Sequence, residues 1–159
     1  ATKFGELIII ATSWSGTESA INMAGKDNFS KKVVIDVTNP LDFTSGVPPK
    51  YTGGVDNSSG EKIQKLLSNA KVVKAFNIIS ANKMCNPQLD EGKADLFIAG
   101  NDKGAKERVK EIASDFGWEN IYDIGDITKS HLLESLAMLW IEFGFKFGTW
   151  THGFKLIKK

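Results

Sequence analysis

Four short apolar runs, rich in β-branched residues, alternate with segments of helical composition along this chain. The runs lack the polar alternation of a half-exposed strand, so each predicts a strand that is buried on both faces of a sheet. Strands that alternate with helices build an α/β domain with a mostly parallel sheet, because a parallel connection needs a crossover and a helix supplies it. The runs are Leu7–Ala11, Lys32–Val37, Val72–Phe76 and Asp95–Ala99.

Helices are predicted between and after these strands. Asp102–Phe116 is the clearest, because its apolar side chains recur on one face and Gly117 can end it. Ser58–Glu61 matches a capping box, in which a serine and a glutamate satisfy free backbone amides at a helix start. Leu41–Asn57 contains three glycines and two prolines and is expected to be a long loop. The other expected elements are helical segments at Ser15–Ala24, Ser80–Cys85 and Thr128–Phe147, and a short strand at Asn120–Ile124.

Composition narrows the class of protein. The 159 residues fit one domain, and we treat residues 1–159 as a single unit. Lys plus Arg number 20 and Asp plus Glu 19, a balance that argues against a nucleic-acid partner. One cysteine excludes an internal disulfide framework and a multi-cysteine metal site. The apolar runs are far shorter than the roughly 20 residues of a membrane helix, and we expect a cytoplasmic protein without a membrane segment.

The side chains that could act as acids, bases or nucleophiles are better explained by structural roles than by catalysis. Cys85 has no neighbouring histidine and is expected to be a semi-buried small apolar residue. His131 is expected to face solvent at the start of the last helix, and His152 to be structural. Asp36 is expected to be a hydrogen-bonded residue at a strand end. No phosphate-binding glycine motif occurs, and Gly100–Gly104 is better explained as the start of a helix.

Three polar segments without ionisable groups follow the predicted strands. They are Thr12–Ser13–Trp14, Thr38–Asn39–Pro40 and Asn77–Ala81. Open α/β sheets bind ligands beyond the carboxyl ends of their strands. Hydride transfer suits such segments, because two rings must be held face to face and no side chain has to donate a proton at the reacting centre.

Together these segments resemble the NADP oxidoreductase, coenzyme F-420-dependent family, whose Rossmann domain recurs in the metalloreductases. The resemblance implies hydride transfer between NADP(H) and a deazaflavin (coenzyme F-420) or flavin-like acceptor. From the residues themselves we expect no catalytic side chain and no metal site. It implies that Trp14, Asn39 and Ala81 contact NADP, with Thr12, Ser13, Thr38 and Pro40 beside them. Asn77 and Ile79 would lie where the nicotinamide meets the second ring. The resemblance rests on Leu7–Trp14, Lys32–Leu41, Ala70–Ala81, Asp95–Asp102 and Ser130–Trp140.

One departure from the family pattern is large. The family begins with a strand, a glycine fingerprint and a second strand that selects NADP over NAD, and about 60 residues of this kind are missing here. Leu7–Ala11 would then be an exposed apolar edge. The chain is then a piece of a longer enzyme, or is joined by a separate segment, or covers this edge with another subunit. Without those strands we expect these 159 residues to bind a dinucleotide only weakly.

The last predicted helix is apolar over more than one stripe, and the resemblance implies packing at a homodimer interface and near the substrate. A different class of function stays open, namely a non-enzymatic half-domain that acts through oligomerisation or assembly with a partner. A flavodoxin-like signalling or phosphate-binding domain is disfavoured, because Thr12–Ser13–Trp14 offers neither an acidic cluster nor a phosphate loop. The sequence leaves the acceptor and the choice between NADP and NAD undetermined.

Overall fold

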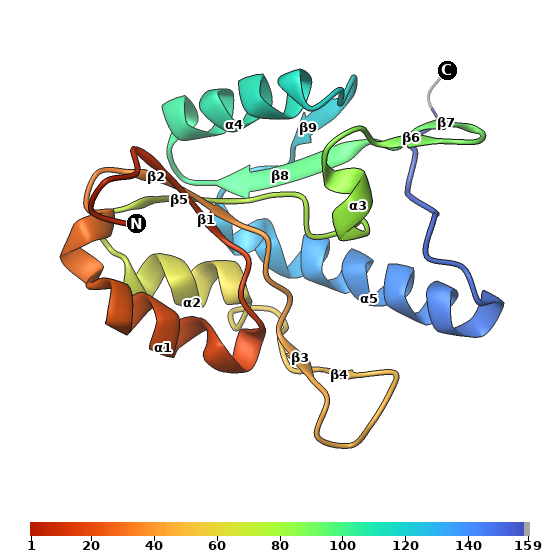
Figure 1. Cartoon of the computed structure of the whole chain (residues 1–159), viewed down its shortest axis with the longest axis horizontal. Helices are drawn as coiled ribbons and strands as arrows, with labels where there is room; N and C mark the ends of the chain where they lie inside the picture. The colour runs from red at the N-terminus through yellow and green to blue at the C-terminus, as the bar shows by residue number, and fades with distance from the viewer. Residues whose placement is uncertain (158–159) are drawn as a thin grey trace.

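A five-stranded sheet forms the centre of the computed structural model, which describes residues 1–157 (Figure 1). Neighbouring strands are parallel except where β5 meets β8, which runs in the opposite direction. This confirms the predicted Rossmann-like, mostly parallel α/β sheet. In spatial order the strands are β1 (Leu7–Ile10), β2 (Val33–Asp36), β5 (Lys71–Lys74), β8 (Leu96–Gly100) and β9 (Ile121–Asp123).

Helices cover both faces of this sheet. Figure 1 shows α4 on one side, with α1, α2 and α5 on the other. The predicted helices are all present. Four of them begin and end within two residues of their expected bounds, whereas α2, which was expected to continue to Ala70, ends at Leu66. They are α1 (Trp14–Ala24), α2 (Ser59–Leu66), α3 (Ala81–Met84), α4 (Lys103–Asp115) and α5 (Ser130–Phe147), with short 3-10 turns η1 (Lys26–Phe29) and η2 (Ile127–Lys129).

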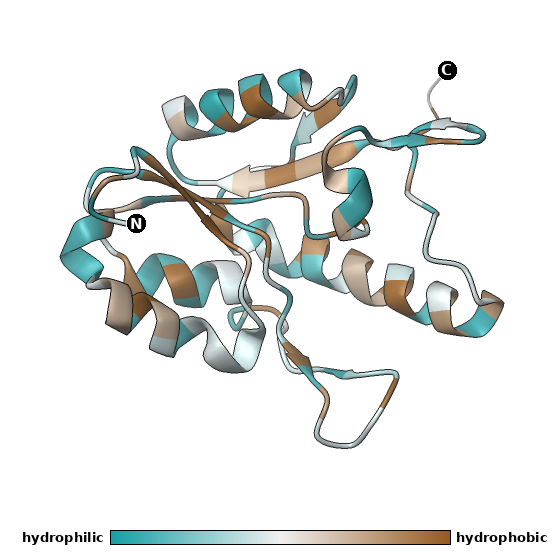
Figure 2. Ribbon diagram, viewed as in Figure 1, coloured by the Kyte–Doolittle hydropathy of each residue, from teal (hydrophilic) through white to brown (hydrophobic). Residues whose placement is uncertain are grey.

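Side chains of each central strand pack alternately into two cores. Ile35 and Val73 face α4, where they join Val109, whereas Val34 and Val72 face α1 and α2. All of these side chains are fully buried. The two-sided burial explains why the strands are continuous apolar runs, which Figure 2 shows as apolar colour along the strands.

Local signals for helix ends are confirmed by backbone geometry. The Ser58 side chain accepts a hydrogen bond from the Glu61 amide, and the Glu61 side chain accepts one from the Ser58 amide, which is the reciprocal capping box. Asp102 caps α4 by accepting a hydrogen bond from the Ala105 amide. Gly117 follows α4 with a φ of 92°, a conformation that favours glycine.

Two expectations need correction. The segment from Leu41 to Asn57 is not an irregular loop throughout, because β3 (Leu41–Asp42) and β4 (Lys50–Tyr51) pair as a small antiparallel hairpin. Strands of two residues leave no recognisable period in a sequence, and the same holds for β6 (Gln88–Leu89) and β7 (Gly92–Lys93). Cys85 is exposed rather than semi-buried, because α3 ends one residue before it.

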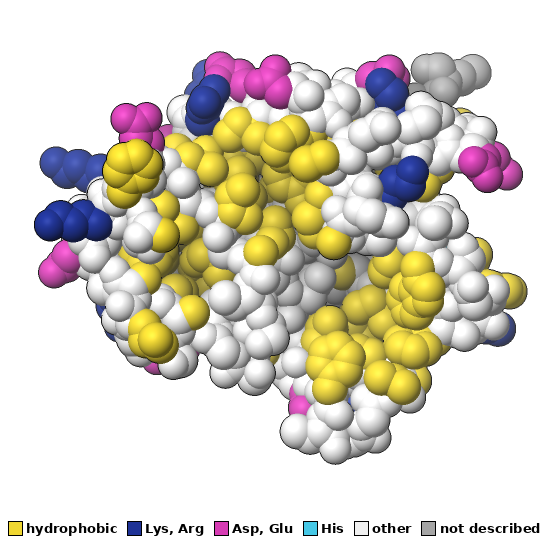
Figure 3. All heavy atoms as spheres, in the orientation of Figure 1, with side chains coloured by type: hydrophobic (Ala, Val, Ile, Leu, Met, Phe, Trp, Pro, Cys, Tyr) yellow, Lys and Arg dark blue, Asp and Glu magenta, His cyan; other side chains and the backbone are white. Residues whose placement is uncertain are grey.

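Several large apolar side chains are exposed, and two groups of them bear on assembly, at β1 and on α5. In the part of the chain that the structure describes, β1 pairs with β2 alone, and the Ile9 side chain is 53% exposed. On α5, Leu132, Leu139 and Phe143 are also partly exposed. Figure 3 shows that hydrophobic side chains gather in patches on the face of the molecule turned to the viewer. No helix among residues 1–157 has the length and apolar character needed to span a membrane.

Candidate functional site

The carboxyl ends of β1 and β2 open into one cavity of about 340 Å³, which we call the strand-end cavity. Parallel strands place their carboxyl ends at the same edge, so two segments far apart in sequence meet here. The hairpin β3–β4 and helix α3 close its sides. It is lined by Ala11, Thr12, Ser13, Trp14, Ser15, Val37, Thr38, Asn39, Leu41, Phe43, Ala81 and Met84.

Six of the nine predicted cofactor-binding residues line this cavity: Thr12, Ser13, Trp14, Thr38, Asn39 and Ala81. The other three, Pro40, Asn77 and Ile79, are buried nearby and do not line it. The lining combines hydroxyl, amide and indole groups with apolar side chains, and it includes no carboxylate, lysine, histidine or cysteine. Such a wall can bind and orient a ring, and it has no group that would act as a general acid or base.

A pair of asparagines joins the ends of β2 and β5. The Asn39 side-chain amide donates to the Asn77 carbonyl oxygen at 2.9 Å, and the Asn77 amide donates back to Asn39 Oδ1 at 2.9 Å. Asn77 also donates to the Leu133 carbonyl oxygen at 3.1 Å, which ties the pair to α5. Both hydrogens of the Asn77 amide are therefore used. Its Oδ1 atom is buried and has no hydrogen-bond partner among the described residues.

Ile79 was expected beside the nicotinamide, but it lies in the core and is 6% exposed, because the segment after α5 folds back over it. Gly153 of that segment approaches closely, and a Cβ atom there would lie 2.8 Å from Ala94 Cβ and 3.8 Å from Ile79 Cδ1. His152 stacks on Trp140 with ring centroids 4.5 Å apart. The structural role predicted for His152 is therefore confirmed, whereas the return of this segment had no signal in the sequence.

A cluster of buried charges lies beneath the strand-end cavity. Lys74 forms ion pairs with Asp36 at 2.9 Å and with Glu134 at 3.2 Å, and all three side chains are completely buried. Asp36 accepts hydrogen bonds from the Thr38 amide and hydroxyl, so its expected role at a strand end is confirmed. Sequence reasoning missed Lys74 and Glu134, because a lysine in a strand and a glutamate in a helix are usually solvated.

Tyr51, on β4, reaches the same cluster from the hairpin. Its hydroxyl donates to Glu134 Oε2 at 3.3 Å. Burial, followed by the negative charge of Glu134, raises the pKa of Tyr51 to about 12. The hydroxyl therefore stays protonated, and able to donate, throughout the neutral pH range.

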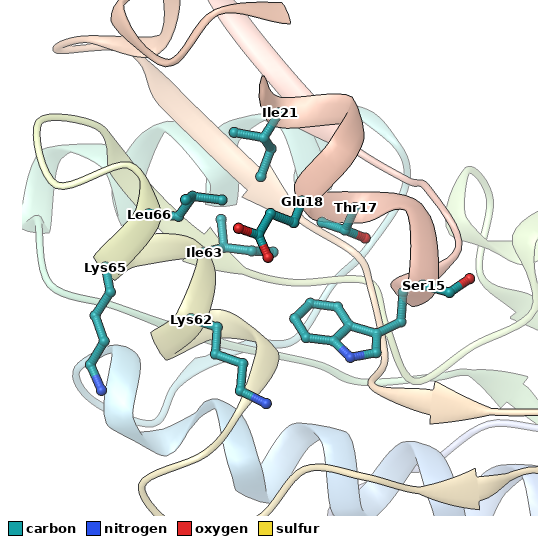
Figure 4. A pocket seen from close by; sticks show the side chains of 9 residues that line it. Ser15, Thr17, Glu18, Ile21, Lys62, Ile63, Lys65 and Leu66 are labelled. Carbon is teal, nitrogen blue, oxygen red and sulfur yellow. The ribbon is translucent and has the colours of Figure 1, made fainter. Parts of the chain in front are cut away.

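A second cavity, of about 590 Å³, lies between α1 and α2 (Figure 4). Figure 4 shows Lys62 and Lys65 of α2 on one side and Glu18 and Thr17 of α1 on the other. The Lys62 ammonium lies 5.5 Å from the centre of the Trp14 ring. Trp14 lines both cavities, but this one lies between helices rather than at the ends of the strands. The site predicted from the residues that follow the strands therefore corresponds to the strand-end cavity and not to this second cavity.

Among residues 1–157, no three histidine, cysteine, aspartate or glutamate side chains lie together in a way that could hold a metal ion.

Comparison with curated proteins finds relatives along nearly the whole chain. The F420-dependent NADP reductase of Methanocaldococcus jannaschii is 27% identical over 161 residues, which cover 98% of this chain and 70% of the relative. The metalloreductase STEAP3 of Rattus norvegicus is 28% identical over 139 residues, which cover 87% of this chain and 26% of the relative. No protein-family model matches the chain.

Solved structures give a closer relative. A protein from Arthrobacter sp. FB24, provisionally assigned as an F420-dependent NADP reductase, superposes with a TM-score of 0.94 at 34% identity and covers 99% of this chain and 72% of its own. A hypothetical protein from Sinorhizobium meliloti superposes with a TM-score of 0.65 at 27% identity over 81% of this chain and 60% of its own. A dehydrogenase from Pyrococcus horikoshii, at 12% identity and a TM-score of 0.53, shares the fold.

Proposed function

This chain belongs to the family of F420-dependent NADP reductases, and on that premise we propose that it transfers hydride between NADP(H) and a deazaflavin or flavin-like acceptor. The observation that carries the proposal is the strand-end cavity, with its polar but non-ionisable wall. A redox cofactor supplies its own chemistry and asks the protein to bind and orient it.

The residues present fit the nicotinamide end of NADP. A volume of about 340 Å³ suits one ring with its substituents, because small-molecule pockets begin near 300 Å³. Nicotinamide carries one carboxamide, which both donates and accepts hydrogen bonds. Thr12, Ser13 and Asn39 offer partners in the cavity wall, and the unpartnered Oδ1 of Asn77 is a buried acceptor directly behind Asn39. Trp14, Val37 and Leu41 supply apolar surface for the ring.

The chemistry assigns each group a role in binding rather than in proton transfer. When bound, the nicotinamide ring gives or takes a hydride, which is two electrons with one proton. Thr12, Ser13 and Asn39 would fix the orientation of the ring, and Trp14, Leu41 and Phe43 would exclude water from it. Holding two rings in a near-attack geometry accounts for much of the rate in such a reaction.

Cofactor and acceptor follow from the family. We propose NADP as the dinucleotide and coenzyme F-420 as the acceptor, with a flavin as the second candidate, because the relatives are named F420-dependent NADP reductases. Every residue that supports this proposal would contact the nicotinamide half of the dinucleotide. A cytoplasmic location stays a prediction that rests on the low cysteine content.

Asn39→Ala is expected to weaken binding of reduced nicotinamide mononucleotide and of NADPH about tenfold, which corresponds to about 1.4 kcal/mol. The substitution removes a polar group from the cavity wall and leaves the Asn77 carbonyl oxygen without its donor. Tryptophan fluorescence can follow the titration, because Trp14 lines the cavity. The mononucleotide tests the nicotinamide half by itself.

Asn69→Ala is the matched control. Asn69 is exposed and precedes β5, so it lies at the amino end of the sheet, and its replacement should leave both affinities unchanged. Equal binding by wild type and Asn39→Ala would contradict the proposed site. Binding without oxidation of NADPH by coenzyme F-420 or a flavin would contradict the proposed reaction while leaving the site in place.

A homodimer is the second part of the proposal, and partly exposed apolar side chains on α5 support it. Leu132, Leu139 and Phe143 are each between 41% and 59% exposed on one helix. Assembly without catalysis, through this helix or through the edge of β1, is the alternative function that the same observations favour.

Light scattering of the purified chain, with and without NADPH, separates these two functions. We expect a dimer that binds NADPH, with the weak affinity predicted from the sequence. A stable oligomer that ignores NADPH and coenzyme F-420 would favour the assembly function instead, and a monomer at all concentrations would contradict both uses of the apolar surface.

A further inference from the structure

Glu134 of α5 contacts groups from three other elements while its side chain is completely buried. Its Oε1 atom accepts hydrogen bonds from the Ser59 hydroxyl at 2.7 Å and from the Gly60 amide at 3.2 Å, and it lies 3.2 Å from the Lys74 ammonium. Its Oε2 atom accepts a hydrogen bond from the Tyr51 hydroxyl. One carboxylate therefore joins the hairpin β3–β4, the start of α2 and the end of β5.

Lys74 extends these contacts to the end of β2. Its ammonium donates to Asp36 Oδ2 at 2.9 Å, to the Ser59 hydroxyl at 2.6 Å and to the Thr38 carbonyl oxygen. Asp36 in turn holds the Thr38 amide and hydroxyl at 2.8 and 2.7 Å. Asp36 therefore holds the backbone amide of Thr38 and Lys74 holds its carbonyl oxygen, directly before Asn39.

Two walls of the strand-end cavity come from segments that this network contacts. Thr38 and Asn39, at the end of β2, form the strand wall, and Leu41 and Phe43, of the hairpin β3–β4, form the hairpin wall. Tyr51 is the residue that pairs with Leu41 across the hairpin. The hydrogen bond from Tyr51 to Glu134 therefore connects the hairpin wall to the buried charges that hold the strand wall.

We propose that Glu134 is a positioning residue for the strand-end cavity, which acts through the Tyr51 hydroxyl to hold the hairpin wall in the conformation that binds the nicotinamide ring. The identity of the ring rests on the proposed function, and the mechanical coupling does not. When a pocket is formed only part of the time, the apparent dissociation constant rises in inverse proportion to the fraction that is competent. Loosening the hairpin should thus weaken binding and leave the chemical step intact.

Tyr51→Phe tests the coupling with the smallest change, because it removes one hydroxyl and keeps the ring. We expect the backbone amides of residues 41–51 to exchange hydrogen about tenfold faster in the ligand-free protein. We expect the KM for NADPH to rise about tenfold, with kcat at saturating NADPH within twofold of wild type. A loss of overall stability alone would not divide KM from kcat in this way.

Tyr122→Phe is the matched control, since the chain has two tyrosines and Tyr122 lies on β9 at the far edge of the sheet. It should change neither the exchange of residues 41–51 nor the KM. Glu134→Leu supplies the second test, because leucine cannot hydrogen-bond the Tyr51 hydroxyl. In a Glu134→Leu background, Tyr51→Phe should change the exchange rate and KM by less than about twofold, because the two groups act through one bond.

Three results would overturn the proposal: unchanged hairpin exchange in Tyr51→Phe, an unchanged KM, or an equal effect of Tyr51→Phe in both backgrounds. Hydrogen exchange is measured without nucleotide. If wild type fails to bind NADPH, the proposed function fails, and the exchange experiment still confirms or rejects the coupling by itself.

Discussion

Lys74→Met should lower the free energy of unfolding by about 3 to 5 kcal/mol, the largest single effect we expect in this chain. The substitution keeps most of the length of the side chain and removes the cation that lies between Asp36 and Glu134. Both carboxylates are completely buried and would be left without a positive partner. Urea unfolding followed by circular dichroism measures the change.

Lys71→Met is the matched control, on the same strand. Its partner is Asp102 at 3.2 Å, and both side chains are partly exposed, so water replaces the lost contact. Its unfolding midpoint should stay close to that of wild type. Adding Asp36→Asn and Glu134→Gln to Lys74→Met should recover part of the lost stability, because the uncompensated charge is then removed. Equal effects of the two lysine substitutions would contradict the buried network.

Gly60→Ala should destabilise the fold by about 1 to 3 kcal/mol, as overpacking in a closed contact does. Gly60 lies in the first turn of α2, against the start of α5. A Cβ atom there would overlap the Ser130 hydroxyl and lie 2.7 Å from Ser130 Cβ and 3.3 Å from Ile127 Cδ1. The Gly60 amide also donates to Glu134, so a shift of α2 would disturb the positioning network.

Gly16→Ala applies the same substitution in α1, where the nearest atom to an added Cβ is Ser13 Oγ at an ordinary 3.5 Å. Alanine is a better helix former than glycine, so this variant should be more stable by about 0.5 to 1 kcal/mol. Thermal unfolding of the two variants should therefore move in opposite directions. A stabilised Gly60→Ala would show that α2 and α5 are not in close contact.

Much of the fold could be predicted because its signals are local. A continuous β-branched run such as Val33–Ile35 has side chains in both cores, and nothing but a two-sided strand explains it. The Ser58–Glu61 capping box and the Gly117 turn depend on neighbours within a few residues. The hairpin β3–β4 could not be predicted, because two-residue strands are defined by their partner and not by a pattern of their own.

The candidate site divides in the same way. Residues that follow strands, such as Thr12, Thr38 and Asn39, could be chosen from the sequence, because parallel topology brings strand ends together. Tyr51, Lys74 and Glu134 could not, since each is an ordinary residue of its element until the others approach it. The covering of Ile79 by the segment around Gly153 likewise needs a contact across 74 positions of the chain, from 79 to 153.

The two-sided strands, their alternation with helices and the polar, non-ionisable strand ends could be read from residues 1–159 alone, because periodicity and residue chemistry are properties of short segments. Which of these strand ends share a cavity, and which charges meet beneath it, depends on how the elements pack. Burial is the physical reason: Lys74, Asp36 and Glu134 are charged side chains whose presence in the interior is tolerable only together. That condition depends on three elements packing at once, and it is invisible in any one of them.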